Sequence, residues 1–276
     1  MLSLLGSKAD KPFSIFSNPH LSAPHSTRKI MWGIFASLLP IWVAGFFAFG
    51  WDAFRIGLIA LFSSVSFECL FRILIGRKTY VQNASAVLTA TFLAFLLPPE
   101  IPWQLILLAA FLSVVMGKEI YGGLGQNLFH PSLVGYAALL LFFPHEMSRS
   151  ELLGGASLFA IVVSGVILGV KKWTAWEASF FYLAAVAICS FLLGRLVKFE
   201  VLTGAIFLCA FFFVTDWTTT PTTREGRSLF AVGAGVLTAV IRTWASSAEA
   251  AVSSVLLMNA LVPLIDLFVR TQKKAA

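Results

Sequence analysis

The chain has 276 residues, of which 58% are hydrophobic and 12% are charged, and its formal net charge is +7. Soluble domains carry about 25% charged residues, so this composition excludes an ordinary soluble protein and indicates an integral membrane protein. The 27 Phe and 8 Trp residues suit contact with lipid and anchoring at its interfaces. We therefore expect membrane lipid among the partners and no nucleic acid, because the positive charge follows the membrane topology described below.

The N-terminal segment 1–29 is predicted to lie on the cytoplasmic membrane surface. It contains Asp10 and the breaks Gly6, Pro12 and Pro19, with no long apolar run before a cleavage site, which excludes a secretory signal. The three cysteines stand singly in apolar stretches, without a CxxC pair. We therefore predict no metal site and no iron–sulfur cluster held by this chain alone.

Ten apolar runs follow the N-terminal segment, and all are expected to be helical because the alternating polarity of a barrel strand is absent. They cover residues 30–49, 54–74, 84–97, 101–117, 132–143, 152–170, 178–196, 201–214, 229–241 and 250–268. If the N-terminus is cytoplasmic, 15 Lys and Arg residues lie inside and 5 lie outside. This asymmetry predicts an all-α polytopic protein with both termini in the cytoplasm.

The two halves of the chain show a weak internal correspondence. Residues 30–144 and 152–268 would each form a five-helix repeat, followed by a cytoplasmic tail at 269–276. Short apolar runs, 84–97 and 201–214, occupy matching places, and one helix later each half reaches a basic residue, Lys118 or Arg242. With five helices per half the repeats would be inverted, and short helices at matching places are typical of a binding site near the membrane midplane.

Two polar segments interrupt the apolar pattern, and both are predicted to face the cytoplasm. The first, residues 121–131, reads YGGLGQNLFHP, and the second, residues 214–227, reads VTDWTTTPTTREGR. Either segment could hold a polar ligand, since irregular backbone near hydrocarbon occurs only where it is buried or lines a cavity. The alternatives are an ordinary glycine loop for the first and a hydrated turn with helix-capping threonines for the second.

Single ionisable residues have simpler interpretations. Glu68 lies inside an apolar run, where a carboxylate suggests function, but Arg72 at i+4 predicts an ion pair along one helix. His130 beside Pro131 is interpreted as a polar loop residue rather than as a proton relay.

With these segments identified, the sequence resembles the D-type membrane component of the Rnf ion-translocating electron transport complex and, more distantly, the B-type component of the sodium-pumping NADH:quinone reductase. The similarity runs over nearly the whole chain. It is carried by these motifs: Asn18-Pro-His20, 26–32 (STRKIMW), 85–89 (SAVLT), 96–99 (LLPP), 117–118 (GK), 122–127 (GGLGQN), Pro131, Thr215-Asp216, Pro221, Thr223, Gly226-Arg227 and 257–266 (LMNALVPLID).

The resemblance implies a ten-helix subunit of the bacterial cytoplasmic (inner) membrane that passes electrons through flavins while a cation crosses, together with other subunits of an Rnf-type complex. It places a flavin, riboflavin or FMN, near the cytoplasmic face. The residues implied at this flavin site are Thr89, Gly122, Gly123, Gln126, Asn127, Thr215, Asp216 and Thr219. Trp217 stands where the family usually has proline.

One departure from the family is large. The family carries FMN esterified to a threonine in the outer loop between the fifth and sixth spans, but here that loop shortens to residues 144–151 (PHEMSRSE), without a threonine. We therefore expect no covalent FMN threonine. Ser148 and Ser150 do not stand in the family's motif, so any flavin is expected to be non-covalent.

Three hypotheses follow from these observations. The chain is a redox subunit that keeps a non-covalent flavin near Asn127, or a scaffold or ion-path subunit whose partners carry the electrons, or a freestanding channel or carrier. The first is favoured because it gives the glycine and amide motif a purpose.

Overall fold

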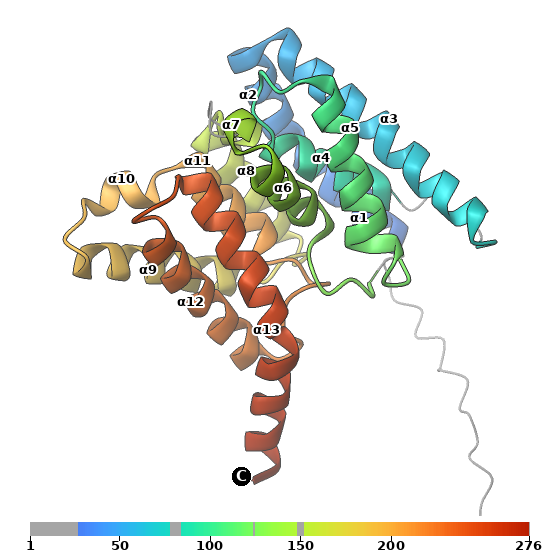
Figure 1. The fold of residues 1–276 in the computed structure, drawn as a ribbon. Coiled ribbons are helices and arrows are strands. Elements are labelled where there is room, and N and C mark those ends of the chain that lie inside the picture. Colours follow the sequence, from blue (N-terminus) through green and yellow to red (C-terminus); the bar gives the residue numbers. More distant parts are fainter. Residues whose placement is uncertain (1–26, 78–83, 124, 148–151, 276) are drawn as a thin grey trace, which may run out of the picture.

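The computed structural model describes residues 27–77, 84–123, 125–147 and 152–275 (Figure 1). Within these ranges every regular element is a helix and no strand occurs, which confirms the all-helical prediction. Three helices are long and apolar enough to cross a membrane: Thr27–Phe49, Trp51–Leu74 and Ser247–Gln272. The predicted N-terminal segment up to residue 26, and the loop residues Ser148 and Ser150, lie outside the described residues.

The first half of the chain forms helices that start and stop at proline and glycine. Pro40 lies in the first turn of α2, Gly50 with φ +56° separates α2 from α3, and Pro131 opens α6. The elements are α1 (Thr27–Ser37), α2 (Leu39–Phe49), α3 (Trp51–Leu74), α4 (Ser85–Leu96), α5 (Trp103–Phe111), the π-helix η2 (Leu112–Glu119), α6 (Pro131–Phe142) and α7 (Pro144–Met147).

The second half is also helical. Its elements are η3 (Leu153–Gly155), α8 (Leu158–Val170), α9 (Trp176–Leu192), α10 (Val197–Val201), α11 (Gly204–Leu208), the π-helix η4 (Cys209–Phe213), α12 (Arg224–Ile241) and α13 (Ser247–Ala275). The side chain of Thr223 accepts a hydrogen bond from the backbone N–H of Gly226 and caps α12. Ser157 caps α8 in the same way through the N–H of Ala160.

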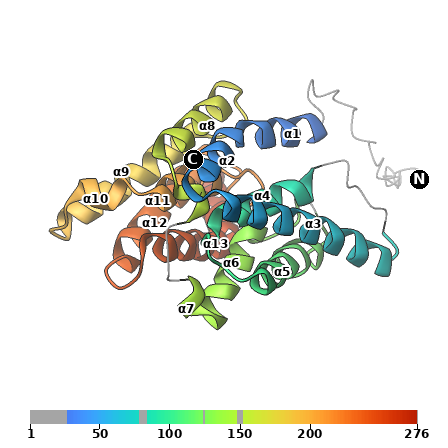
Figure 2. The ribbon, with the colours of Figure 1, turned by 90° about the horizontal axis from the view of Figure 1, so that it is seen from above.

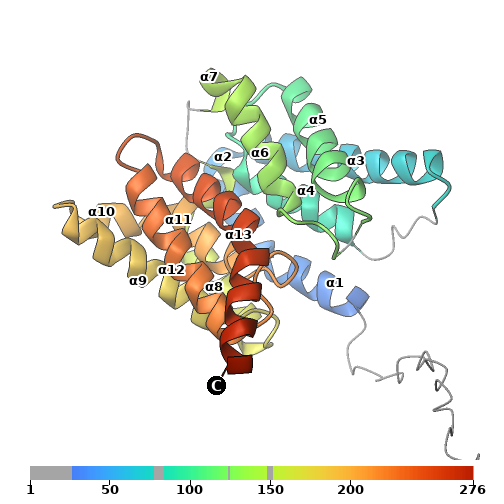
Figure 3. The same ribbon diagram turned by 60° about the horizontal axis from the view of Figure 1, so that its bottom comes forward.

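The two halves lie side by side, and short helices meet between them. In the first half α3 packs on α4 and α5, whereas in the second α12 packs on both α9 and α13 (Figures 1 and 3). Contacts between the halves join α6 to α13, α1 to α8, and α4 to η3. Every residue of α4 except Val87 is buried, so this short helix lies in the centre of the molecule.

The outer surface is strongly apolar. Four large side chains are each at least 76% exposed: Phe47 of α2, Phe159 of α8, Leu192 of α9, and Trp244 in the turn after α12. Figure 2 shows where α2, α8, α9 and α12 lie. A soluble monomer rarely exposes contiguous apolar patches of more than a few hundred Å². Large apolar side chains on this many outer faces are therefore consistent with a surface that lies in lipid.

Candidate functional site

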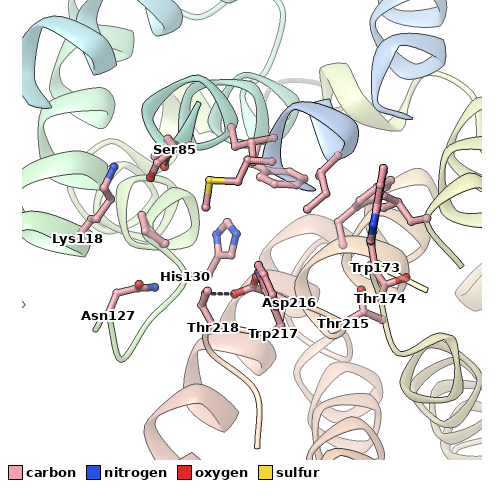
Figure 4. Close-up of a pocket in the computed structure, with 18 residues that line it drawn as sticks. Ser85, Lys118, Asn127, His130, Trp173, Thr174, Thr215, Asp216, Trp217 and Thr218 are labelled. Atoms are coloured by element: carbon pink, nitrogen blue, oxygen red, sulfur yellow. Dashed lines mark hydrogen bonds between the residues drawn. The ribbon is translucent and has the colours of Figure 1, made fainter. Parts of the chain in front are cut away.

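A pocket lined by both apolar and polar residues lies where the two halves meet. Its walls come from α1, α4, the end of η2 and residues 127–131 of the first half, and from α8, residues 173–174, η4 and residues 215–218 of the second (Figure 4). Its cavity volume is about 90 Å³, which is smaller than the roughly 300–1,000 Å³ that is usual for small-molecule sites. The polar residues that line it are Ser85, Thr89, Lys118, Asn127, His130, Thr174, Thr215, Asp216 and Thr218.

Four of the eight residues implied by the family resemblance line this pocket: Thr89, Asn127, Thr215 and Asp216. Thus the two polar segments, which are almost 90 residues apart in the sequence, contribute to one site. The other four residues, Gly122, Gly123, Gln126 and Thr219, do not line the pocket. They form or support the turns that carry the lining residues.

The glycine-rich segment is a turn that only glycine builds easily. Gly122, Gly123 and Gly125 have φ values of +117°, +103° and +81°, in the region that side chains with a Cβ rarely adopt. The N–H of Gly123 donates to the carbonyl of Lys118 at 3.2 Å, and the N–H of Gln126 donates to the carbonyl of Gly123 at 3.2 Å. The turn brings the chain back from η2 to Asn127, whose amide Nδ2 donates to the carbonyl of Phe129 at 2.9 Å.

The threonine-rich segment holds the Asp216 carboxylate from its own side. The hydroxyl groups of Thr218 and Thr219 both donate to Asp216 Oδ2, the second at 2.9 Å (Figure 4 draws the first). The hydroxyl of Thr215 donates to the carbonyl of Phe211 at 2.6 Å. The bonds from Thr218 and Thr219 hold Asp216 at the pocket wall. The same threonines stabilise the turn, so this segment has both a structural role and a place in the pocket wall.

His130 lies in the middle of the pocket, between Lys118, Ser85 and Asn127 on one side and Asp216 on the other (Figure 4). Its side chain is buried, and burial lowers the pKa of the imidazole, against the opposing attraction of the Asp216 carboxylate. The interpretation of His130 as an ordinary polar loop residue missed this position. Only its place directly before Pro131, at the N-cap of α6, hinted at it.

Four buried charged residues lie next to the glycine turn: Glu68, Arg72, Lys118 and Glu119. Glu68 and Arg72 form the predicted i,i+4 ion pair at 3.1 Å, which is confirmed, but each also has a partner on η2. The Arg72 guanidinium donates to both carboxylate oxygens of Glu119, at 2.9 and 3.1 Å, and Lys118 Nζ donates to Glu68 at 2.9 Å. All four side chains are at most 9% exposed. Lys118 links this charge cluster to the pocket, which it also lines.

A second cluster of charged residues lies in the second half, around Glu200. Glu200 pairs with Arg242 at 2.6 Å and with Arg195 at 3.3 Å. Arg242 also donates to the carbonyl oxygens of Phe199 and Glu200. This cluster joins the ends of α9 and α12 through α10, as the first one joins the ends of α3 and η2.

Comparison with known proteins finds relatives that match nearly the whole chain. The NQR2, RnfD, RnfE family matches residues 14–153 and 149–275. The chain is 29% identical to the D component of the Na(+)-translocating ferredoxin:NAD(+) oxidoreductase complex of Acetobacterium woodii, over 93% of each chain. It is 29% identical to the proton-translocating counterpart of Clostridium ljungdahlii, over 95% of this chain and 96% of that one. It is 31% identical to the D component of the ion-translocating oxidoreductase complex of Ectopseudomonas mendocina, over 92% and 93%. Since the family match spans nearly the whole chain, this protein belongs to the NQR2, RnfD, RnfE family.

Proposed function

We propose that this chain is the D-type membrane subunit of an Rnf-type ion-translocating oxidoreductase complex, and that its pocket holds a non-covalent flavin. Its relatives are named as subunits of such complexes, so other subunits are its natural partners and the bacterial inner membrane its location. The observation that carries the flavin assignment is the convergence of Thr89, Asn127, Thr215 and Asp216 on one pocket between the halves.

We also propose that the chain crosses the membrane ten times, as two inverted five-helix repeats with both termini in the cytoplasm. The two charge clusters support this topology. Glu68 and Lys118 join the ends of the second and fourth apolar helices of the first half, and Glu200 and Arg242 join the corresponding ends in the second half. In the proposed topology the first cluster lies inside and the second outside, as inversion requires.

The lining residues offer the chemical groups that bind a flavin, but the cavity of about 90 Å³ would have to widen to admit the flavin ring. Phe92 and Phe212 provide aromatic surface on the pocket wall, and hydroxyl, amide, imidazole and carboxylate groups surround it. The one lining ammonium group, that of Lys118, is already paired with Glu68, and Asp216 adds a carboxylate. This balance favours an uncharged flavin such as riboflavin over FMN, whose phosphate would meet no unpaired cation among the lining residues. A flavin there would supply electron transfer, while the chain positions it and sets its electrostatic surroundings.

The test is a flavin analysis of the purified chain in mild detergent. Absorbance spectra before and after acid precipitation, combined with the intact protein mass, separate the outcomes. Flavin released into the supernatant with an unmodified protein mass is the expected result. A mass increased by an FMN phosphodiester would contradict the non-covalent assignment. A chain without flavin, both alone and in its native complex, would favour a scaffold or ion-path subunit.

Asn127→Ala is expected to lower flavin occupancy several-fold, because the substitution removes an amide from the pocket wall and the hydrogen bond that shapes residues 127–129. The matched control is Gln104→Ala. This amide is exposed on α5 and does not line the pocket, so the variant should retain its flavin. Occupancy is the ratio of released flavin to protein, measured by fluorescence after acid precipitation. Equal occupancy in both variants would remove Asn127 from the site.

A further inference from the structure

An apolar groove opens on the outer surface of the first half, away from the pocket between the halves. Residues of α1 and α2 form one wall, α3 forms the other, and the buried residues Ala90 and Thr91 of α4 form its deep end. Of these helices, α2 packs on α3, α3 packs on α4, and α1 packs on α4 (Figure 2). The groove has a cavity volume of about 440 Å³, whereas the pocket between the halves has about 90 Å³. The groove is therefore of the size that is usual for a ligand site.

Small residues and one tight contact keep this groove open. Ala53 of α3 and Ala90 of α4 are both buried, and they line the groove together with Gly57. A Cβ at Gly57 would lie 2.6 Å from the ring of Trp42, so this ring packs directly on the glycine. Trp42 also packs on Phe95 of α4, at a centroid distance of 5.0 Å between the rings. These contacts hold the two walls apart at a fixed distance, and the small side chains leave the space between them unfilled.

The mouth of the groove is continuous with the apolar outer surface of the protein. Phe46, Phe47 and Phe54 line the groove, and all three are exposed. None of the described residues that line the groove is charged, and the Thr91 hydroxyl and the Trp42 indole N–H are the only polar side-chain groups among them. Because this outer surface lies in lipid, whatever enters the groove is apolar and comes from the membrane.

The shape of the groove favours a hydrocarbon tail over a segment of protein. An empty groove would leave its aromatic lining without partner atoms, which forfeits dispersion energy. Membrane helices pack closely through small residues, but bulky Phe rings border this mouth and would hold a partner helix away. A non-helical protein segment would place unpaired N–H and C=O groups against an apolar lining. A hydrocarbon tail carries no such groups and bends to follow the walls.

We propose that this groove is a lipid-binding site, in which one acyl chain of a membrane phospholipid lies between α2 and α3 and reaches α4. At 3.6 residues per turn, Ala90 and Thr91 lie on the side of α4 opposite to Thr89 and Phe92, which line the pocket between the halves. The acyl chain thus supports the central short helix from the lipid side. This site does not depend on what the pocket between the halves binds.

Lipid titration followed by native mass spectrometry tests the proposal. The full chain is delipidated in mild detergent, and phosphatidylglycerol with palmitoyl and oleoyl chains is added. The native chain should bind one molecule that remains attached when the surrounding lipid is exchanged for detergent. Phosphatidylcholine with the same acyl chains should bind within about twofold of phosphatidylglycerol, because the groove offers no charged residue to the head group. Before delipidation, the molecule that the chain retains should have the mass of a phospholipid.

Leu58→Trp is expected to weaken binding of phosphatidylglycerol about tenfold. Leu58 lines the groove and is exposed, so the larger indole ring can enter the groove from α3 without displacing buried residues. Leu70→Trp is the matched control, because Leu70 is exposed on the same helix and does not line the groove. This control should bind the lipid as the native chain does. A thermal melt without lipid checks that both variants keep their fold.

Three results would overturn the lipid site. The first is a native chain that binds no phospholipid, or that retains a different apolar molecule before delipidation. The second is a Leu58→Trp variant that folds and binds as tightly as the native chain. The third is a strong preference for phosphatidylglycerol, which would show that head-group contacts elsewhere hold the lipid. A chain that lacks flavin but retains one phospholipid would contradict the proposed flavin and support the lipid site.

Discussion

Replacing Arg72 with methionine is expected to lower the free energy of unfolding by about 3 kcal/mol, roughly 6–12 °C in the melting temperature. Arg72 is the only residue among those described that bonds both oxygens of Glu119, and it also pairs with Glu68. The Glu119 side chain is 1% exposed. Without the guanidinium its charge would remain buried, and the one cation still paired with it among the described residues would be Lys118, at 3.9 Å. Melting in mild detergent, followed by size-exclusion fluorescence, measures the change.

A second substitution distinguishes the buried charge from lost packing. The double variant Arg72→Met/Glu119→Met removes both members of the pair and should melt well above Arg72→Met alone, because no orphaned carboxylate remains. Arg77→Met is the matched control, since Arg77 is exposed just beyond the end of α3, and its loss should change stability by less than about 0.5 kcal/mol. If the double variant melts no higher than the single one, the loss of stability in Arg72→Met comes from lost packing and not from the buried charge of Glu119.

Much of the architecture follows from local patterns in the sequence. The apolar runs predicted that the chain is helical, since hydrocarbon forces the backbone to bond within its own segment. The Glu68–Arg72 pair followed from i,i+4 spacing alone. The capping threonine Thr223 also follows from local chemistry, because a hydroxyl at a helix start accepts from the backbone two or three residues later.

The rest depends on contacts between distant segments, which spacing cannot reveal. Arg72 also bonds Glu119, which is 47 residues away in the sequence. The prediction of the Glu68–Arg72 pair was therefore correct, but it omitted the second partner of Arg72. The ring of His130 packs against Phe213, and its pKa is affected by Asp216; both residues belong to the other half. The π-helices η2 and η4 also have no simple sequence signal.

Gly204→Ala is expected to destabilise the protein by about 1–3 kcal/mol and to lower its flavin content. A Cβ at Gly204 would lie 2.7 Å from the Gly155 carbonyl carbon, and closer still to the Cα and carbonyl oxygen of that residue. These are backbone atoms and cannot rotate away, so α11 would have to move off η3. Because α11 continues into η4, which carries Phe213 and leads to Asp216, this shift would widen the pocket at the wall that holds His130.

Gly155→Ala tests the same contact from its other side and is the matched control. A Cβ at Gly155 would meet Gly204 Cα at 3.5 Å, an ordinary van der Waals distance, so this variant should fold and bind flavin as the native chain does. The two alanines add the same atom to the same pair of glycines, and only the direction of the Cβ differs. A lower melting temperature and lower flavin occupancy in Gly204→Ala alone would tie the approach of η3 and α11 to the pocket. Equal behaviour of the two variants would mean that this contact yields without moving η4, and that the other helices packed on η4, namely α8, α9 and α13, hold the pocket wall instead.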